Sequence, residues 1–492
     1  MKKLLLAMTL FLPTLSAALA QAPYKVYTSP KLPMRETLER MNLVLAWNAR
    51  VNVDGNRDGI FSVQFIPGRP NQLVVQTFKG AVFLYDADSG DLIWKTQVGI
   101  AYWIGEPVTW NSQSIFVTRR TTLFVLNRFD GSQRVYTYNP TLRQADFGFD
   151  LGYTPNAAPV ADEDLLYVSL GDRVQAFFIP DFEKIERMKQ DKGGAKKVVV
   201  KGAYGETIPT GPDSPQPSYY WGYLFGDKTM SSAPLLYGPQ VSLLTTDGTL
   251  TSVDRFEEGP RKELFEIKLT GRTPAAPGQY HNIAYIGSDD FNLYAINMAG
   301  GQQGGQLVWR YIAGAPILRQ PHVNDADVYI TPDRVGLRRV DRRFGREVWT
   351  NRDVQKFLAA NLTNVYARDR IGKFYVLDGR RGTTLATHNL MDWTISIANE
   401  WTDRIYLAAN DGQVICLRHR DLPRPLSMKS REDPNMKKPM EKKEEKKDEE
   451  KKEEKKDNAA LPQRLPQAIA ARHDPGPRIE ATAMDRRRWA GR

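Results

Sequence analysis

Cysteine and histidine are scarce in this sequence, and their scarcity removes several kinds of site. The 492 residues include one cysteine, Cys416, and five histidines, no two of which lie within five residues of each other. One cysteine can form neither a disulfide within the chain nor a cysteine-based zinc site. The histidine spacing excludes the local pairs that commonly bind metals. P-loop, Gly-x-Ser-x-Gly and His-Glu-x-x-His patterns are also missing, so we predict no catalytic residues.

Long hydrophobic runs are missing after residue 20. None approaches the roughly 18 apolar residues of a membrane-spanning helix, so no transmembrane segment is expected in the mature chain. Residues 1–20 place Lys2 and Lys3 before a short apolar run and end in Ala-Leu-Ala, the pattern of a secretory signal peptide. We therefore predict an exported protein of the periplasm or cell surface. Gln21 stands where a lipoprotein has cysteine, so we predict that it is not a lipoprotein.

The body of the chain has only a small excess of positive over negative charge. Lys and Arg number 68 against 57 Asp and Glu, a formal net charge of +11. Lys2 and Lys3 supply two of these charges, and residues 437–492 supply a net +5. The remaining excess is ordinary for a body of this size, so no nucleic-acid partner is predicted.

A repeated unit organises the chain. In its clearest copy, Gln72–Gly99, two apolar strands lead to Asp86, Gly90 follows, and a last strand carries Trp94. The same spacing returns at Asp341, Gly345 and Trp349, and weaker copies complete the series. The residues in the register of Asp86 are Asp86, Asn127, Pro180, Asp254, Asn297, Asp341, Asp378 and Arg418. A repeat of roughly 40 residues is typical of an array of four-stranded modules.

Eight copies predict an all-β fold, an eight-bladed β-propeller of four-stranded antiparallel blades over residues 42–429. Seven blades plus a partial one are the alternative. The apolar run Val82–Tyr85 predicts a strand packed on both faces, which a ring of sheets provides. Pro423 and Pro425 disfavour a fourth strand after the last copy, so we predict that residues 42–51 supply it and close the ring. Residues 21–41 form a lead-in segment.

These units resemble the PQQ-like β-propeller repeat of the quinoprotein-alcohol-dehydrogenase-like superfamily, over about residues 42–425. The resemblance implies either a dehydrogenase that holds pyrroloquinoline quinone (PQQ) and calcium, or a cofactor-free scaffold like the outer-membrane assembly factor BamB. Such dehydrogenases commonly place a vicinal disulfide over the quinone, which Cys416 alone cannot form. No matching set of acidic base and calcium ligands stands out either. The resemblance is therefore closest in character to BamB, with no cofactor expected and PQQ disfavoured.

One loop contains the beginning of a calcium site. Asp54, Asn56 and Asp58 place side-chain oxygens at positions 1, 3 and 5, with Gly59 at position 6. Position 12 is Phe65 instead of the usual bidentate glutamate. The segment is either a Ca²⁺ site or a turn before the first inner strand.

The repeats are interrupted by an insertion at about 187–230. It ends in five aromatic residues, Tyr219, Tyr220, Trp221, Tyr223 and Phe225. We expect the insertion to connect the outermost strand of one blade to the innermost strand of the next. Its aromatic side chains either pack on the propeller as a local lid or bind a partner protein.

Arginine is enriched in the turns of the last three units. These residues are Arg342, Arg343, Arg346, Arg380, Arg381, Arg418 and Arg420. Adjacent blades would align the turns as one basic arc, on the face opposite to the insertion. The arc either binds carboxylate or phosphate groups of a partner or consists of ordinary solvated turns.

From residue 430 the composition changes to lysine and glutamate, and residues 430–492 are predicted to be a disordered, low-complexity tail. Together these features predict a non-catalytic scaffold that binds proteins of the cell envelope, with a BamB-like role in outer-membrane protein assembly as one form of it. The alternative is an enzyme or sensor that binds PQQ or a sugar in the central funnel.

Overall fold

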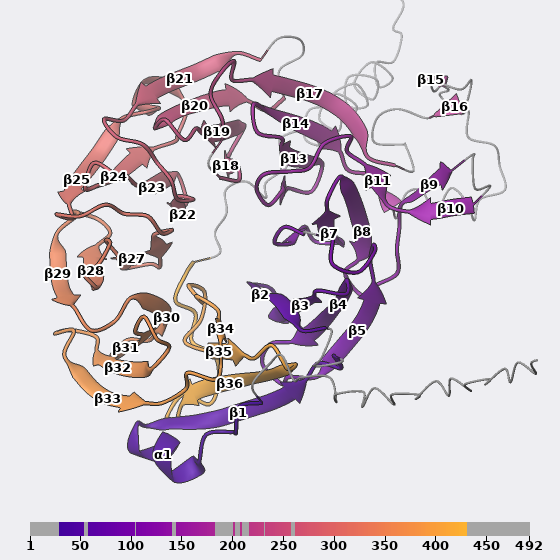
Figure 1. Ribbon diagram of the computed structural model, residues 1–492. Helices are drawn as coiled ribbons and strands as arrows, with labels where there is room; N and C mark the ends of the chain where they lie inside the picture. The colour runs from indigo at the N-terminus through magenta and orange to yellow at the C-terminus, as the bar shows by residue number, and fades with distance from the viewer. Residues whose placement is uncertain are drawn as a thin grey trace, which may run out of the picture. The chain divides into compact units, whose positions relative to one another are not determined.

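The computed structural model describes residues 29–53, 58–103, 105–139, 144–182, 200–201, 207–208, 216–230, 232–256 and 261–430 (Figure 1). The predicted signal peptide and the predicted tail from residue 431 lie outside the described residues. Eight four-stranded antiparallel sheets form a ring, as the sequence predicted. The helical elements described are α1 (Arg35–Arg40) and the short 3-10 turn η1 (Gly301–Gln303).

In blades 1 to 7 the strands follow one another from the centre of the ring outward. Blade 1 contains β2 (Ile60–Ile66), β3 (Gln72–Thr77), β4 (Ala81–Asp86) and β5 (Leu92–Gln97). Blade 2 contains β6 (Thr109–Trp110), β7 (Ser114–Arg119), β8 (Thr122–Asn127) and β11 (Phe149–Asp150). Blade 3 contains β12 (Val160–Ala161), β13 (Leu165–Ser169), β14 (Arg173–Phe178) and β17 (Ser218–Leu224). Blade 4 contains β18 (Leu235–Tyr237), β19 (Gln240–Leu244), β20 (Thr249–Asp254) and β21 (Glu263–Lys268).

The remaining blades have the same order. Blade 5 contains β22 (Gly278–Tyr280), β23 (Ile283–Gly287), β24 (Asn292–Asn297) and β25 (Leu307–Ile312). Blade 6 contains β26 (His322–Val323), β27 (Asp327–Ile330), β28 (Leu337–Asp341) and β29 (Glu347–Asn351). Blade 7 contains β30 (Lys356–Ala360), β31 (Asn364–Arg368), β32 (Phe374–Asp378) and β33 (Thr384–His388). Blade 8 contains β34 (Ile395–Ser396), β35 (Ile405–Ala408), β36 (Gln413–His419) and β1 (Leu43–Arg50).

The ring is closed by the two ends of the propeller. Strand β1 is the outermost strand of blade 8 and pairs antiparallel with β36, with Leu45 opposite Leu417 and Asn48 opposite Ile415. This pairing confirms the prediction that residues 42–51 supply the fourth strand of the last blade. Pro423 and Pro425 disfavour such a strand in the chain that follows β36. The first and last blades are thereby joined by backbone hydrogen bonds.

The hydrophobic core is divided into eight layers, each between two neighbouring blades. In β4, Val82 and Leu84 pack in the layer between blades 1 and 2, whereas Phe83 and Tyr85 pack in the layer between blades 8 and 1. A strand buried on both faces needs apolar side chains at successive positions, which explains the run that the sequence shows.

Tryptophans on the outer strands of blades 1, 3, 5, 6 and 8 fasten these blades to the next one in the ring. Trp94 of blade 1 donates a hydrogen bond from Nε1 to the Arg128 carbonyl of blade 2, over 2.9 Å. Its ring lies against Gly131, where a Cβ atom would come within 2.6 Å of it, and Gly131 has a φ of +71°. Glycine is required there because it has no side chain and adopts positive φ freely. Trp349 has the same relation to Gly379 and Gly382 in the following blade.

The antiparallel order defines two faces of the ring. We call the four strands of a blade A, B, C and D from the centre outward. The DA face holds the connections from strand D of one blade to strand A of the next, and also the turns between second and third strands. The CD face holds the turns between first and second strands and those between third and fourth strands. Successive antiparallel strands reverse direction, so every blade contributes its connections to the two faces in the same way.

Two segments are added to the ring. The hairpin of β9 (Tyr136–Asn139) and β10 (Gln144–Phe147) interrupts the outer edge of blade 2, and β15 (Val200–Lys201) pairs with β16 (Thr207–Ile208) between β14 and β17. The predicted position of the insertion is therefore wrong in two respects. It ends before β17 at Ser218, and it joins the third and fourth strands of blade 3, so it leaves from the CD face.

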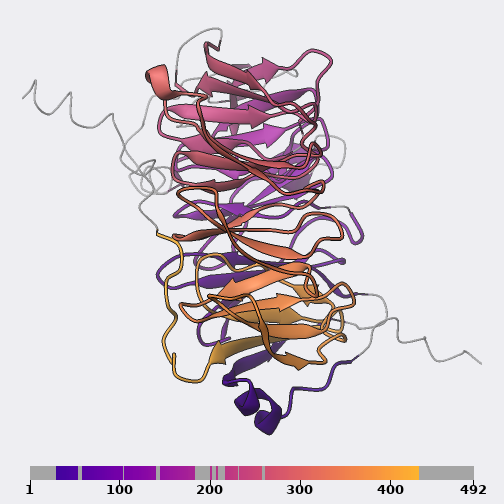
Figure 2. The ribbon, with the colours of Figure 1, turned by 90° about the vertical axis from the view of Figure 1, so that its left-hand side faces the viewer.

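The chain after β36 forms a strap, residues 422–430, that passes from blade 8 to blade 6. The Leu426 amide donates to Asp403 Oδ1 over 2.8 Å, and the Met428 amide donates to the Trp401 carbonyl over 2.8 Å. Farther along, the Asp325 amide of blade 6 donates to the Met428 carbonyl over 3.0 Å. Figure 2 shows this yellow segment following one face of the ring.

Candidate functional site

The aromatic group predicted in the insertion belongs to an outer strand. Trp221 lies in β17 and is buried, and its Nε1 donates to the Arg255 carbonyl of blade 4 over 3.0 Å. It is therefore a blade-fastening tryptophan like Trp94, and the expectation that it could face a partner is wrong. Tyr220 stacks near Phe178 with ring centroids 4.4 Å apart.

The other members of this group lie along the outer edge of blade 3. The hydroxyl of Tyr223 donates to Glu263 Oε1 over 2.6 Å, and its ring meets the ring of Phe225 edge to face. Burial, followed by this contact with Glu263, raises the pKa of Tyr223 above its usual range. Tyr219 is exposed. Packing between blades 3 and 4 explains most of the group, and a partner at Tyr219 stays a prediction.

The predicted basic arc occupies the CD face of blades 6, 7 and 8, where its turns hold equivalent positions in consecutive blades. Its expected position on the face opposite to the insertion is wrong, because the insertion leaves from the CD face as well. Arg342 is engaged in the fold, because its Nε donates to the Asp325 carbonyl over 2.9 Å and its guanidinium lies 3.8 Å from the Tyr280 ring centroid. Arg418 donates to the Arg420 carbonyl over 3.0 Å, and Arg420 pairs with Asp421. The exposed arginines of the arc are Arg343, Arg346, Arg380, Arg381 and Arg420. Partner binding at the arc stays a prediction.

The calcium prediction falls on the edge of the described chain. Asp54 and Asn56 lie outside the described residues. Asp58 is buried, and its Oδ1 accepts the amide hydrogens of Gly59 and Lys79 over 2.9 and 3.0 Å. Asp58 thus holds the turn before β4, and a Ca²⁺ site in this loop stays a prediction. Within the described ranges, no group of three or more His, Cys, Asp or Glu side chains is arranged to hold a metal.

The DA face carries most of the exposed apolar side chains found at the two faces. Eight that are at least 47% exposed are Ile100, Tyr102, Tyr153, Leu224, Phe291, Ile312, Leu318 and Ile371. They come from connections, strand ends and turns of blades 1, 2, 3, 5 and 7. At the CD face, comparable residues are Phe129, Phe344 and Leu362. The DA face therefore offers more apolar side chains to a partner protein than the CD face does.

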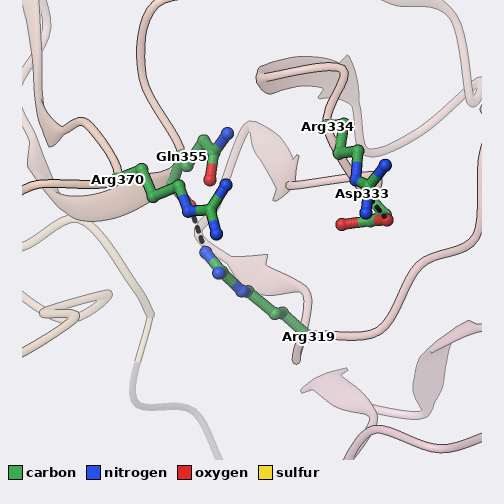
Figure 3. A pocket seen from close by; sticks show the side chains of 5 residues that line it. All are labelled: Arg319, Asp333, Arg334, Gln355 and Arg370. Atoms are coloured by element: carbon green, nitrogen blue, oxygen red, sulfur yellow. Dashed lines mark hydrogen bonds and ion pairs between the residues drawn. The ribbon is translucent and has the colours of Figure 1, made fainter.

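A small cavity opens on the same DA face between blades 6 and 7. Its volume is about 180 Å³, and its lining residues are Arg319, Asp333, Arg334, Gln355 and Arg370 (Figure 3). Arg319 follows β25 and Gln355 precedes β30, whereas Arg334 and Arg370 lie in the turns after β27 and β31. Figure 3 shows Arg319 and Arg370 directed toward the same space from different blades.

Hydrogen bonds hold part of this lining in place. Arg319 Nη1 donates to the Gln355 carbonyl over 2.9 Å, which links the connection before blade 6 to the connection before blade 7. Arg334 Nε lies 3.6 Å from Asp333 Oδ2, and both side chains are at least half exposed. Arg334 has a φ of +58°, a conformation that side-chain-bearing residues rarely adopt.

The sequence did not point to this cavity. Its three arginines follow strands of three different blades, and the turns and connections that carry them differ in length. One signal was present: Arg334 and Arg370 each follow the second strand of their repeat. Aligning the repeats on these turns, rather than on the turns after Asp86 and its equivalents, would have placed them together.

The described residues contain no helix long and apolar enough to cross a membrane. A family model described as "Outer membrane protein assembly factor BamB" matches residues 247–420, which extend from blade 4 to the end of β36. No curated protein matches the sequence.

Two solved structures resemble the fold. BamB from Moraxella catarrhalis aligns with a TM-score of 0.52 at 14% identity, covering 76% of this chain and 97% of that one. The computationally designed Ika8 protein aligns with a TM-score of 0.48 at 14% identity, covering 73% and 96%. Repeats, ring closure and the first of these alignments define the chain as an eight-bladed β-propeller. Within that class, residues 247–420 match the BamB family model, and the ring is similar in fold to BamB.

Proposed function

We propose that this protein is an exported, non-catalytic scaffold that binds other proteins of the cell envelope, with a BamB-like role in outer-membrane protein assembly. The observation that carries the proposal is the DA face, which presents exposed apolar side chains from several blades and a basic cavity between blades 6 and 7. A rigid ring presents such a face without rearrangement, which lowers the entropy cost of binding.

Export rests on the sequence of residues 1–20, and the envelope role rests on the BamB-like repeats. The DA face is preferred over the basic arc because Arg342 and Arg418 of the arc are engaged within the fold. It is preferred over the aromatic group of β17 because Trp221 is buried between blades.

The test is site-specific photo-crosslinking in the cells that produce the protein. A photoreactive residue replaces Ile371 on the DA face or Leu362 on the CD face, both in blade 7 and 69% and 79% exposed. We expect adducts with outer-membrane assembly proteins from position 371 and none from position 362. Adducts from position 362 alone would move the docking surface to the CD face. The absence of protein adducts from both positions, together with a quinone retained by the purified protein, would favour the funnel-binding alternative.

A further inference from the structure

The cavity between blades 6 and 7 has the charge of an anion-binding site. Three arginines line it, against one aspartate, Asp333, which pairs with Arg334. Within the described part of the chain, neither Arg319 nor Arg370 forms an ion pair with a carboxylate. Positive charge is thus left unneutralised at this point of the DA face.

Neighbouring residues add to this field. Lys356 begins β30, directly after Gln355 of the lining. Burial, and then the charges of Arg368 and Arg319, lower the pKa of Lys356. Arg368 is itself buried, and it donates to the carbonyls of Gly372, Trp393 and Leu390. Its hydrogen bonds go to carbonyl groups, and the neighbouring carboxylate of Asp369 also acts on its charge.

The size of the cavity limits what can enter it. About 180 Å³ is less than the roughly 300–1,000 Å³ of ordinary small-molecule pockets, so a cofactor does not fit inside. One acidic side chain does. Guanidinium groups bind carboxylates through paired, charge-assisted hydrogen bonds, and Arg319 and Arg370 point toward the same space from the connection before blade 6 and from a turn of blade 7.

Apolar side chains flank this cavity. Leu318 lines an adjoining hollow together with Thr331 and Pro332, and it is 48% exposed. Ile371 follows Arg370 and is 69% exposed. We propose that the cavity anchors one aspartate or glutamate of a partner protein, carried by an extended segment whose neighbouring apolar side chains pack on Leu318 and Ile371. This inference rests on the proposed scaffold function and names the chemistry of its partner.

A binding assay with defined probes tests the anchor. The probes are the fluorescently labelled peptide GSLELEGS and its amide twin GSLQLQGS, measured by anisotropy on the full-length mature protein. We expect the glutamate peptide to bind about tenfold more tightly than the glutamine peptide, a difference that added salt reduces. Equal affinities, or no binding of either peptide, would overturn the anchor.

Matched variants locate the binding. Arg334→Glu with Arg370→Glu reverses two exposed charges on the DA face of blades 6 and 7, and should remove the preference for glutamate. Arg343→Glu with Arg380→Glu makes the same change on the CD face of the same blades, and should leave the preference in place. The neutral pair Arg334→Gln with Arg370→Gln serves if the reversed pair fails to fold. Loss of the preference in the CD-face variant alone would assign the anion site to the basic arc.

Failure of the anchor and failure of the scaffold give different results. Crosslinked adducts at position 371 that persist in Arg334→Glu with Arg370→Glu would leave the scaffold standing and overturn the anchor. Inorganic phosphate that binds the protein in an Arg370-dependent manner, without any peptide binding, would also overturn it. Peptide discrimination by the purified protein without adducts in cells would overturn the envelope scaffold instead.

Discussion

Lys429 Nζ lies 2.8 Å from Glu400 Oε2, and this ion pair fastens the strap of residues 422–430 to blade 8. Both side chains are largely buried, and His322 Nδ1 of blade 6 lies 2.9 Å from the other oxygen of Glu400. The strap therefore ties together two blades that are not neighbours in the ring.

The pair should make stability depend on pH. Burial alone would raise the pKa of Glu400, but Lys429 and His322 outweigh it and lower this pKa to about 2. A depressed folded-state pKa stabilises the protein fully above about pH 4.5, and the contribution disappears as the pH falls toward 2. We expect wild type to lose roughly 2–3 kcal/mol of unfolding free energy over this window through Glu400.

Urea unfolding at several pH values measures this loss. Glu400→Gln should flatten the dependence between pH 4.5 and 2, whereas Glu36→Gln, an exposed control on α1, should keep the wild-type slope. Identical slopes in wild type and Glu400→Gln would show that Glu400 is not held ionised by its partners.

Gly382 should be among the least replaceable residues of the ring. An added Cβ would lie 2.5 Å from the Trp349 ring, and φ is +70°. Gly382→Ala should cost about 1–2 kcal/mol for the backbone and about 1–3 kcal/mol more for the contact. Gly314→Ala separates the two effects, because Gly314 has a φ of +68° with no atom within 4 Å. Equal losses of stability on urea unfolding would show that the tryptophan contact contributes nothing.

The alkylation rate of the Cys416 thiol should report on the pairing of β1 with β36, which closes the ring. Burial raises the pKa of its thiol above the usual range, and Cys416 pairs across β1–β36 with Trp47. Trp47→Ala should speed thiol alkylation about tenfold or more relative to Trp349→Ala, because about 1.4 kcal/mol lost from a local opening equilibrium is a factor of ten. Equal rates in the two variants would mean that the thiol is exposed only by global unfolding.

Replacing Arg342 should destabilise the protein more than replacing its neighbour in the basic arc, Arg343. Arg342→Ala removes the hydrogen bond to the Asp325 carbonyl and the contact with the Tyr280 ring, and should cost about 1–2 kcal/mol. Arg343 is exposed, so Arg343→Ala should change stability by less than about 0.5 kcal/mol. Thermal unfolding of both variants at one protein concentration decides this, and similar melting temperatures would contradict a structural role for Arg342.

The ring was predictable because its determinants are local and repeated. A third strand ends near Asp86 and near each of its seven equivalents, and Gly90 has the positive φ that its turn was expected to need. Closure by residues 42–51 followed from two prolines, Pro423 and Pro425, without any knowledge of pairing.

The candidate site was less predictable because its residues are separated in the sequence and come together only in the folded ring. The position of Trp221 was predicted wrongly. Pro180 marks the end of the third strand of its repeat, and the inserted segment separates Trp221 from it, so the aromatic cluster was assigned to a loop instead of the fourth strand. The cavity joins side chains from different repeats through connections of different length, and only the packed ring brings them together. The contact of Arg342 with the Tyr280 ring likewise depends on a neighbouring blade.

Closure through β1 sets the order in which this protein can mature. Leu43–Arg50 leaves the ribosome first, and its partner Gln413–His419 leaves last. Until then Trp47 has no Cys416 beside it and the edge of β36 does not exist. A chain that emerges from its N-terminus therefore carries β1 without its partner until β36 is made, and closure of the propeller is a single late event rather than a blade-by-blade accumulation.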